Sequence, residues 1–126
     1  MAAADPGAAE MREPLLELRD ALRAFAAERD WDQFHSPRNL ATALAVEAAE
    51  LLEPFQWLTE EQSSNLPPEA RAAVEEELAD VLLYLVRLAD KLDVDLEAAA
   101  RAKIVRNAAK YPVEKSRGSS RKYDAL

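Results

Sequence analysis

The sequence predicts an all-α fold, a four-helix bundle, and three observations support the helical prediction. Only 2 of the 126 residues are Gly, β-branched residues are few, and Ala, Leu, Glu and Arg are abundant, a composition that favours helix. Four segments carry apolar residues at helical spacing. Short connections join them, so neighbouring helices should pack side by side.

The first predicted helix covers about residues 14–29 and carries one apolar stripe. This stripe consists of Leu15, Leu18, Leu22 and Phe25. The preceding residues, 1–13, form an Ala-rich lead that we expect to be flexible.

The second predicted helix follows the aromatic-rich loop "RDWDQFHSPRN". It should begin near Pro37 or Arg38, because Ser36 can serve as its N-cap and Pro is favoured in the first turn. It should end or bend around Pro54, which has no N–H to donate to the carbonyl of Glu50.

The third predicted helix covers about residues 68–92, after a loop "LTEEQSSNLPPEA". Its polar positions Glu76, Arg87 and Asp90 lie away from the apolar stripe, so we expect them to face solvent.

The fourth predicted helix covers about residues 95–110, and Pro112 ends it. We therefore assign 14–112 to one all-α domain and 113–126 to a basic tail that is mobile unless an anionic ligand orders it. The core stripe of the third helix comprises Leu78, Val81, Leu82, Leu85, Leu88, Ala89 and Leu92.

Composition excludes several classes of function. The net charge of -8 argues against nucleic acid polymers and anionic membranes as partners, although a bound cation would still allow a small anionic substrate. The absence of Cys excludes disulfides, thiolate zinc sites and a cysteine nucleophile. No signal peptide is recognisable, and the longest apolar run, "VLLYLV", is too short to span a bilayer. We therefore expect a cytoplasmic protein.

Two pairs of carboxylates are directed toward a predicted helix–helix interface. In the second helix, Glu47 falls among the leucines of the apolar stripe and Glu50 lies to one side of it. In the third helix, Glu77, Asp80 and Tyr84 line one border of the stripe. Each pair is spaced three residues apart, so both carboxylates of a pair share one helical face.

An interface with four acids needs a compensating positive charge. Burying an unpaired carboxylate is costly, and clustered carboxylates repel one another. A divalent cation would relieve both costs, and all-oxygen ligation without Cys or paired His suits Mg²⁺ or Mn²⁺. Two alternatives remain open: a solvated acidic face, or ion pairs between subunits of a non-catalytic oligomer that use Arg38, Arg87 or Arg106.

The fourth helix carries cations that could meet phosphates. Lys103, Arg106, Asn107 and Lys110 share one face, which indicates either a phosphate clamp or cations that simply favour a helix C-terminus. Aromatic side chains close to the carboxylate segments could stack on a base or pack in the core. Together these features suggest a nucleoside di- or triphosphate as substrate. The aromatic residues concerned are Trp31, Phe34, Phe55, Trp57 and Tyr84.

Several segments resemble a known family. "RDWDQFHSPRNLATALAVEAAELLEPFQW", "EEELADVLLYL", "KIVRNAAKYP" and "SSRKYDAL" are similar to the dCTP pyrophosphatases, in the MazG-like branch of the all-α NTP pyrophosphatases. The resemblance extends over about residues 18–126. It implies Mg²⁺-dependent hydrolysis of dCTP, and of modified dCTP, to dCMP and diphosphate in the sanitisation of the nucleotide pool.

The resemblance also implies roles for individual residues. The metal ligands would be Glu47, Glu50, Glu77 and Asp80. Glu53 is assigned by position and not by the resemblance: it lies one turn past Glu50, where it either orients the attacking water as a general base or is solvated. The base and sugar would contact Trp31, His35, Trp57 and Tyr84, with Arg38 and Asn39 of the same loop motif as further substrate contacts. The phosphates would contact Lys103, Asn107, Lys110 and Tyr111.

The family forms homotetramers built as dimers of dimers, so the resemblance implies that assembly here. Arg121, Lys122 and Tyr123 match the family too, and the tail that carries them could close over a site. Two positions depart from the family pattern: Leu22 replaces a His often found in relatives, and Pro54 replaces an apolar helical residue. The alternative enzymatic function is a house-cleaning NTP pyrophosphatase of broader specificity.

Overall fold

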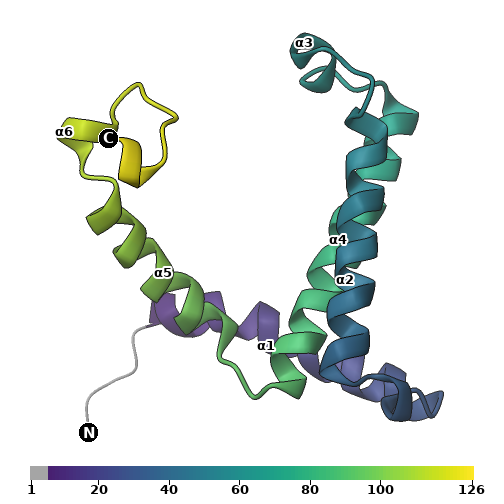
Figure 1. The fold of residues 1–126 in the computed structure, drawn as a ribbon. Coiled ribbons are helices and arrows are strands. Elements are labelled where there is room, and N and C mark those ends of the chain that lie inside the picture. The colour runs from purple at the N-terminus through teal and green to yellow at the C-terminus, as the bar shows by residue number, and fades with distance from the viewer. Residues whose placement is uncertain (1–5) are drawn as a thin grey trace, which may run out of the picture. The chain divides into compact units, whose positions relative to one another are not determined.

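The computed structural model describes residues 6–126, with side chains from residue 14 onward, and these residues contain helices and no strand. The chain forms two units, which meet in sequence between Asp93 and Val94 and are described separately. The all-α prediction is therefore confirmed. The four longest helices match the four predicted segments: α1 (Pro6–Glu28), α2 (Pro37–Leu52) and α4 (Pro68–Lys91) in the first unit, and α5 (Leu96–Lys110) in the second (Figure 1).

Helix α1 begins at Pro6, earlier than the predicted start near residue 14. Alanine is the best helix former, so the Ala-rich segment continues the helix toward the N-terminus. Pro14 is consequently inside the helix. The remainder of the predicted flexible lead, residues 1–5, lies outside the described residues.

Both ends of α2 agree with the sequence prediction. The Ser36 side chain caps the N-terminus by accepting a hydrogen bond from the backbone N–H of Asn39 at 3.1 Å, and Pro37 occupies the first turn. At the other end, α2 stops at Leu52 and a 3₁₀ helix, η2 (Glu53–Phe55), follows. Pro54 thus ends the α-helix, because it cannot donate the next hydrogen bond.

The segment between α2 and α4 contains a one-turn helix, α3 (Glu60–Ser63), where the sequence analysis expected a loop. A capping box forms this turn: Thr59 accepts from the Gln62 backbone N–H at 3.1 Å, and the Gln62 side chain accepts from the Thr59 N–H at 3.0 Å. Two otherwise unpaired backbone donors are thereby satisfied.

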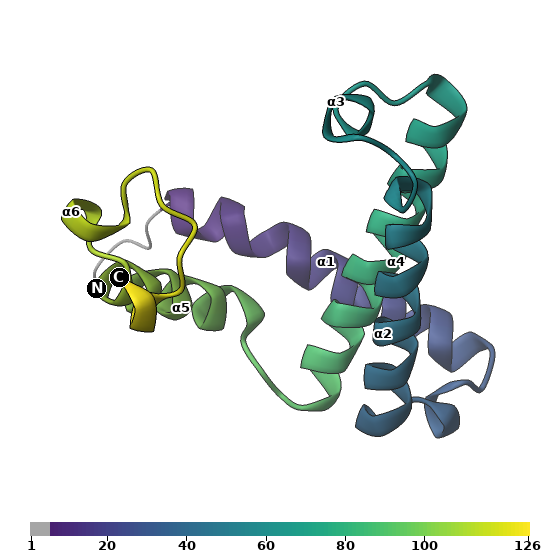
Figure 2. The same cartoon turned by 45° about the horizontal axis from the view of Figure 1, so that its top comes forward.

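Within the first unit, α2 lies along α4, and α1 packs against α4 as well (Figures 1 and 2). Leu40 of α2, Ala26 of α1 and Val86 of α4 are nearly inaccessible to solvent and form the centre of this packing. The predicted core stripe of α4 is only partly buried, because Leu78, at 52% exposure, faces solvent along with Leu82, Leu85 and Leu92. This face is uncovered because α2 packs on a different side of α4.

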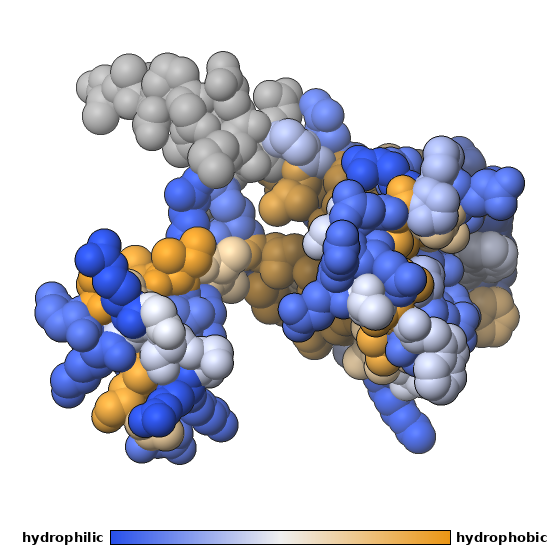
Figure 3. All heavy atoms as spheres, turned by 90° about the horizontal axis from the view of Figure 1, so that it is seen from above, coloured by the Kyte–Doolittle hydropathy of each residue, from blue (hydrophilic) through white to orange (hydrophobic). Residues whose placement is uncertain are grey.

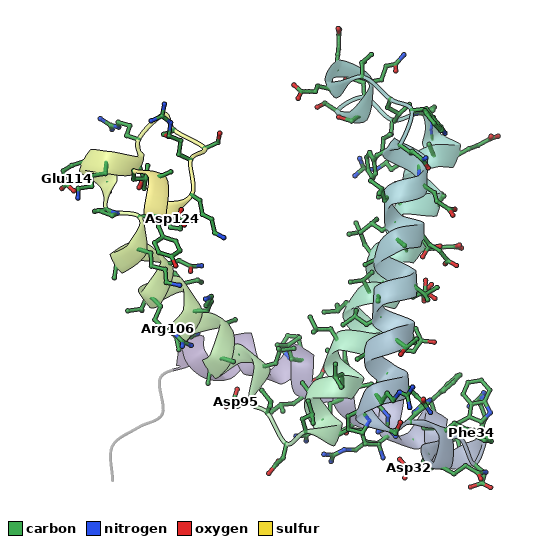
Figure 4. All side chains as sticks on the ribbon, viewed as in Figure 1. Asp32, Phe34, Asp95, Arg106, Glu114 and Asp124 are labelled. Atoms are coloured by element: carbon green, nitrogen blue, oxygen red, sulfur yellow. The ribbon has the colours of Figure 1, made fainter. Side chains whose placement is uncertain are left out.

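The second unit consists of α5, the short helix α6 (Val113–Ser116) and a 3₁₀ helix, η3 (Tyr123–Ala125). Asp95 caps α5 by accepting from the Ala98 backbone N–H at 3.0 Å. The tail that we expected to be mobile therefore contains short helical turns, and the ring of Tyr123 stands edge-on to that of Tyr111 at 6.1 Å. Arg106, Glu114 and Asp124 mark α5, α6 and η3 in Figure 4.

The surface carries hydrophobic as well as charged side chains. In the space-filling view both kinds appear side by side on the face shown (Figure 3). In the second unit the exposed hydrophobic residues include Ile104, Val105 and Val113. Among the described helices, none combines the length and apolar character needed to cross a bilayer.

Candidate active site

Three of the predicted metal ligands meet where α2 packs on α4. Glu47 of α2 and Glu77 and Asp80 of α4 each place a carboxylate oxygen within 4.8 Å of the other two. All three side chains are partly buried. The helical spacing explains this arrangement, because Glu77 and Asp80 are three residues apart on the face of α4 that contacts α2.

These carboxylates lack a compensating positive charge. The Oε2 atoms of Glu47 and Glu77 are buried and have no hydrogen-bond partner, and no cation of the first unit's described residues forms an ion pair with either glutamate or with Asp80. The pKa of Glu47 is raised, first because a protonated Glu47 can share its proton with the Glu77 carboxylate in a hydrogen bond, and then by desolvation. The charges of Glu77 and Asp80 act in the same direction.

Glu50 adjoins this triad through Glu47. Its pKa is also raised, first by a hydrogen bond with Glu47 and then by the negative charge of Glu47. Glu53 follows at the start of η2, where it is exposed and adds a further repulsive charge that acts on Glu50. The structure therefore brings all five predicted acids onto one stretch of the α2–α4 pair, with Glu53 at its solvent-exposed end.

The arrangement fits a divalent cation. The three carboxylate oxygens lie within 4.8 Å of one another, and Mg²⁺ holds its oxygen ligands at about 2.1 Å, so the side chains would have to draw together around an ion. Two unpartnered buried oxygens and the raised pKa values indicate that a cation would be bound favourably here. The residues that could hold it are Glu47, Glu77 and Asp80, with Glu50 adjacent.

Trp31 and His35 lie on the turn between α1 and α2, on either side of the 3₁₀ helix η1 (Asp32–Phe34), which Figure 4 marks with the labels of Asp32 and Phe34. The Trp31 ring is 44% exposed and stands edge-on to Phe25 at 5.6 Å. The Phe25 contact restrains the indole, and the exposed part of the ring is open to a ligand. His35 is partly buried, and its Nδ1 atom accepts a hydrogen bond from Arg87 Nε at 3.2 Å.

The other predicted contacts of the first unit differ in their surroundings. Asn39 donates from its side chain to the Phe34 carbonyl at 2.9 Å, so it ties the turn to α2. Arg38 is exposed, and Trp57, just after η2, is 86% exposed. Tyr84 is partly buried on α4, one helical turn beyond Asp80.

The four predicted phosphate contacts all belong to the second unit. Lys103, Asn107 and Lys110 are exposed on α5, and Tyr111 is its C-terminal cap residue. The tail packs on this end of the helix, because Lys110 Nζ lies 4.9 Å from the centre of the Tyr123 ring.

The sequence analysis missed a polar network at the opposite end of the α2–α4 pair. Arg87 and Asp90, expected to face solvent, are buried and partly buried respectively, so that expectation was wrong. Arg87 donates to Asp32 at 2.7 Å as well as to His35, and Asp90 accepts two hydrogen bonds from Arg23 at 2.8 and 2.5 Å. The Arg–x–x–Asp spacing of Arg87 and Asp90 was the available signal for an ion pair on α4.

In this network each acidic side chain is paired with basic side chains, and the lowered pKa values of the acids reflect this pairing. The pKa of Asp32 is lowered, first by its hydrogen bond with Lys91, and the pKa of Asp90 is lowered, first by its hydrogen bond with Arg23. The side chains border a shallow pocket of about 470 Å³. Its lining consists of Arg23, Ala27, Asp32, Arg87, Asp90 and Lys91.

Comparison with known proteins gives the family. The model of the MazG-like family matches residues 42–126. The chain belongs to the MazG-like family. It is 53% identical to dCTP pyrophosphatase 1 of Mus musculus and 50% identical to that of Homo sapiens, in each case over 117 residues that make up 90% of this chain and 69% of the relative.

A solved structure similar to this chain comes from Archaeoglobus fulgidus. That protein, described as a pyrophosphatase, superposes with a TM-score of 0.72 at 41% identity, over 76% of this chain and 90% of its own. The alignments with the two dCTP pyrophosphatases leave only about a tenth of this chain outside. They therefore include every residue that the sequence analysis placed in the site.

Proposed function

We propose that this MazG-like chain is a Mg²⁺-dependent nucleoside triphosphate pyrophosphohydrolase that converts dCTP and water to dCMP and diphosphate. The observation that carries the proposal is the cluster of carboxylates without compensating cations between α2 and α4. The names of the relatives support dCTP as the substrate, because the proteins at 50–53% identity are named dCTP pyrophosphatase 1.

In this proposal, Glu47, Glu50, Glu77 and Asp80 hold the metal. Bound there, Mg²⁺ would neutralise phosphate charge and polarise a phosphorus–oxygen bond. The four carboxylates would hold the ion, and phosphate oxygens and water would supply its remaining ligands, as is usual for Mg²⁺. Mn²⁺ has a similar preference for oxygen ligands and could replace it.

Glu53 has one of two roles. It lies one turn beyond Glu50 and is exposed, so it can accept a proton from a water molecule beside the cluster. The same exposure also suits a residue that is simply solvated. Comparing kcat of Glu53→Gln with that of the unmodified protein separates the two roles, because only the first predicts a large decrease.

The base binds, in this proposal, at the turn that carries Trp31 and His35. The turn adjoins the start of α2, and ten residues separate Pro37 from Glu47, which corresponds to a rise of about 15 Å. Only an extended ligand could contact both ends, and a nucleoside triphosphate has its base at one end and its phosphates at the other. Tyr84 lies between the two ends on α4 and would contact the sugar. Trp57, Arg38 and Asn39 are the remaining proposed contacts of this unit.

The phosphates would be met by Lys103, Asn107, Lys110 and Tyr111. All four are exposed around α5, and two of them carry the positive charge that a polyphosphate needs. Their role rests on the resemblance to the dCTP pyrophosphatases.

We further propose a homotetramer, a dimer of dimers. The uncovered leucine face of α4 supports self-association, because Leu78, Leu82 and Leu85 are 52%, 39% and 37% exposed. Contiguous exposed apolar residues commonly mark protein–protein interfaces. Light scattering of the purified protein measures the assembly directly.

The test of the function is a substrate panel. The purified protein is incubated with Mg²⁺ and each of the common ribo- and deoxyribonucleoside triphosphates, and monophosphate and diphosphate are separated by chromatography. We expect diphosphate and dCMP from dCTP with little product from the others. Product from many nucleotides would replace dCTP with a broader substrate range. Failure to hydrolyse any nucleotide would contradict the proposed function.

A further inference from the structure

We propose that Arg87 is a positioning residue that fixes the ring of His35 with its proton on Nε2, so that His35 presents one N–H donor to the nucleotide. The inference deepens the proposed function and rests on it for the identity of the ligand. It concerns an arginine that the proposed chemistry does not use.

The contacts of Arg87 hold its guanidinium in one orientation. The residue is only 5% exposed, and each of its three nitrogens has a different partner. Nη2 donates to Asp32 at 2.7 Å and Nη1 to Asp90 at 3.4 Å, while Nε donates to His35 Nδ1 at 3.2 Å. Because the group is planar and its donors form a rigid fork, two carboxylates that hold the Nη atoms also fix the direction of the Nε–H.

This direction determines the protonation state of the imidazole. Arginine cannot accept a hydrogen bond and is always protonated, so Nδ1 of His35 must offer a lone pair. A neutral ring with a bare Nδ1 carries its proton on Nε2. Protonating Nδ1 would oppose two N–H groups and place two positive charges side by side. The ring would then have to leave its position.

The charged groups around His35 act in both directions. Arg87 and Lys91 of α4 disfavour its protonation, and Asp32 of η1 favours it. Partial burial is the largest influence, and the pKa of His35 is lowered in total. Asp90 of α4 and Arg23 of α1 belong to the same network through Arg87, and their hydrogen bonds to each other at 2.8 and 2.5 Å anchor α1 to this end of α4.

The network is continuous with the carboxylate cluster through α4. Asp80, Tyr84 and Arg87 are spaced i, i+4 and i+7, so they share one face of the helix. One helix therefore carries a proposed metal ligand, a proposed sugar contact and the residue that orients His35. A change at Arg87 should affect nucleotide binding and leave the chemistry of the cluster unchanged.

The first experiment uses the fact that His35 is the only histidine of the chain. Nitrogen-15 NMR of the full-length protein therefore reports on one imidazole, its tautomer and its titration. We expect Nδ1 to be unprotonated and Nε2 to carry the proton, with protonation delayed to a lower pH than for an ordinary histidine. A ring protonated on Nδ1, or one that titrates like an ordinary histidine, would overturn the proposal.

The second experiment separates the charge of Arg87 from its hydrogen bond. R87K keeps the positive charge and loses the Nε–H donor, while R87Q loses both. R71Q is the matched control, because Arg71 lies on the same helix in an exposed pair with Glu75. Loss of one positioning hydrogen bond should raise the KM for dCTP roughly three- to tenfold and leave kcat nearly unchanged in R87K. In R87Q the pKa of His35 should also rise. R71Q should change neither quantity.

A double-mutant cycle with H35A decides whether Arg87 acts through His35. If it does, R87K should add little to the KM of H35A. Equal effects of R87K in both backgrounds would show a merely structural role and overturn the proposal. If R87Q does not fold, the kinetics of R87K and the nitrogen-15 NMR spectrum of the unmodified protein still decide whether Arg87 positions His35. If the unmodified protein hydrolyses no nucleotide, the nucleotide part of the proposal fails with the proposed function, whereas NMR still decides whether Arg87 fixes His35.

Discussion

The pKa values of acidic side chains are shifted in opposite directions at the two ends of the α2–α4 pair. In the carboxylate cluster, the pKa values of Glu47 and Glu50 are raised because acids face acids. In the polar network, the pKa values of Asp32 and Asp90 are lowered because each accepts hydrogen bonds from cations. Helix α4 thus contributes to one acidic cluster that has no cationic partner among the described residues and to one network in which acids and cations are paired.

This difference in charge balance distinguishes a network that supports the fold from a cluster that could bind a ligand. A balanced network such as that of Arg87, Asp32 and Asp90 satisfies its members internally and needs no ligand. A cluster with two unpartnered buried oxygens remains unfavourable until protons or a cation arrive. Charge balance within a group of acids, rather than their number, therefore indicates where a metal should bind.

The largest effect should come from breaking the cluster. We expect E47Q or D80N to lower kcat for dCTP by about a thousandfold or more, because several kcal/mol of transition-state stabilisation depend on the bound ion. The fold should persist, since each change removes a repulsive charge. Turnover and circular dichroism measure the two outcomes. Full activity at unchanged Mg²⁺ would disprove the metal-site assignment.

Metal addition should stabilise the protein through the cluster alone. At Mg²⁺ concentrations about 100 times the Kd, the free energy of unfolding should rise by about 2.7 kcal/mol. Thermal unfolding with Mg²⁺ or with EDTA measures this rise. E77Q should abolish most of it, whereas D90N, in the balanced network, should retain it. An equal Mg²⁺ response in both variants would remove the distinction between the two ends.

Breaking the balanced network should lower stability and spare metal binding. We expect D90A to reduce the free energy of unfolding by about 1–3 kcal/mol, because Arg87 loses one of its partners while it remains buried. Urea unfolding at neutral pH gives the value. The exposed neighbour Asp93, changed to Asn, serves as a control and should cost much less.

The smallest expected effects are two opposite responses to pH. The folded-state pKa values of Glu47 and Glu50 are raised, so their contribution to stability is present below the unfolded value near 4.5 and is lost as pH rises through the folded values. The folded-state pKa of Asp90 is lowered, so its contribution is present above 3.8 and is lost as pH falls through the folded value. Without metal, stability should therefore rise on moderate acidification and fall on stronger acidification.

Melting temperatures across this pH range, in EDTA, test both responses. E47Q should reduce the rise in stability on moderate acidification, and D90N should reduce the fall on stronger acidification. A monotonic loss of stability from neutral pH downward in the unmodified protein would contradict the raised pKa values of the cluster.

Local signals in the sequence were sufficient for most of the fold. Ser36, Pro37 and Pro54 correctly bounded α2, and the helical projection correctly directed Glu47, Glu77 and Asp80 toward one interface. The turn α3 was missed although Thr59 and Gln62 have the capping-box spacing. That signal was present, but the following polar residues and prolines suggested a loop.

The polar network could not be predicted in the same way. A helical projection ranks faces by hydrophobicity, and it therefore assigned Arg87 to solvent. Its partners Asp32 and His35 are more than fifty positions away in sequence, so only the packing of the α1–α2 turn against α4 brings them together. The position of the leucine face was missed for a related reason, because periodicity gives an apolar face without showing what covers it.

That leucine face has a consequence for how the protein would behave on dilution. Leu78 and Leu82 occupy the same two turns of α4 as Glu77 and Asp80, so in the proposed assembly a neighbouring copy that covered the leucines would also restrain the helix that carries the carboxylates. Dissociation would free this segment and loosen the spacing of the acids. Specific activity would then depend on protein concentration, and a cell that produced little of the protein would lose more activity than the number of missing molecules accounts for.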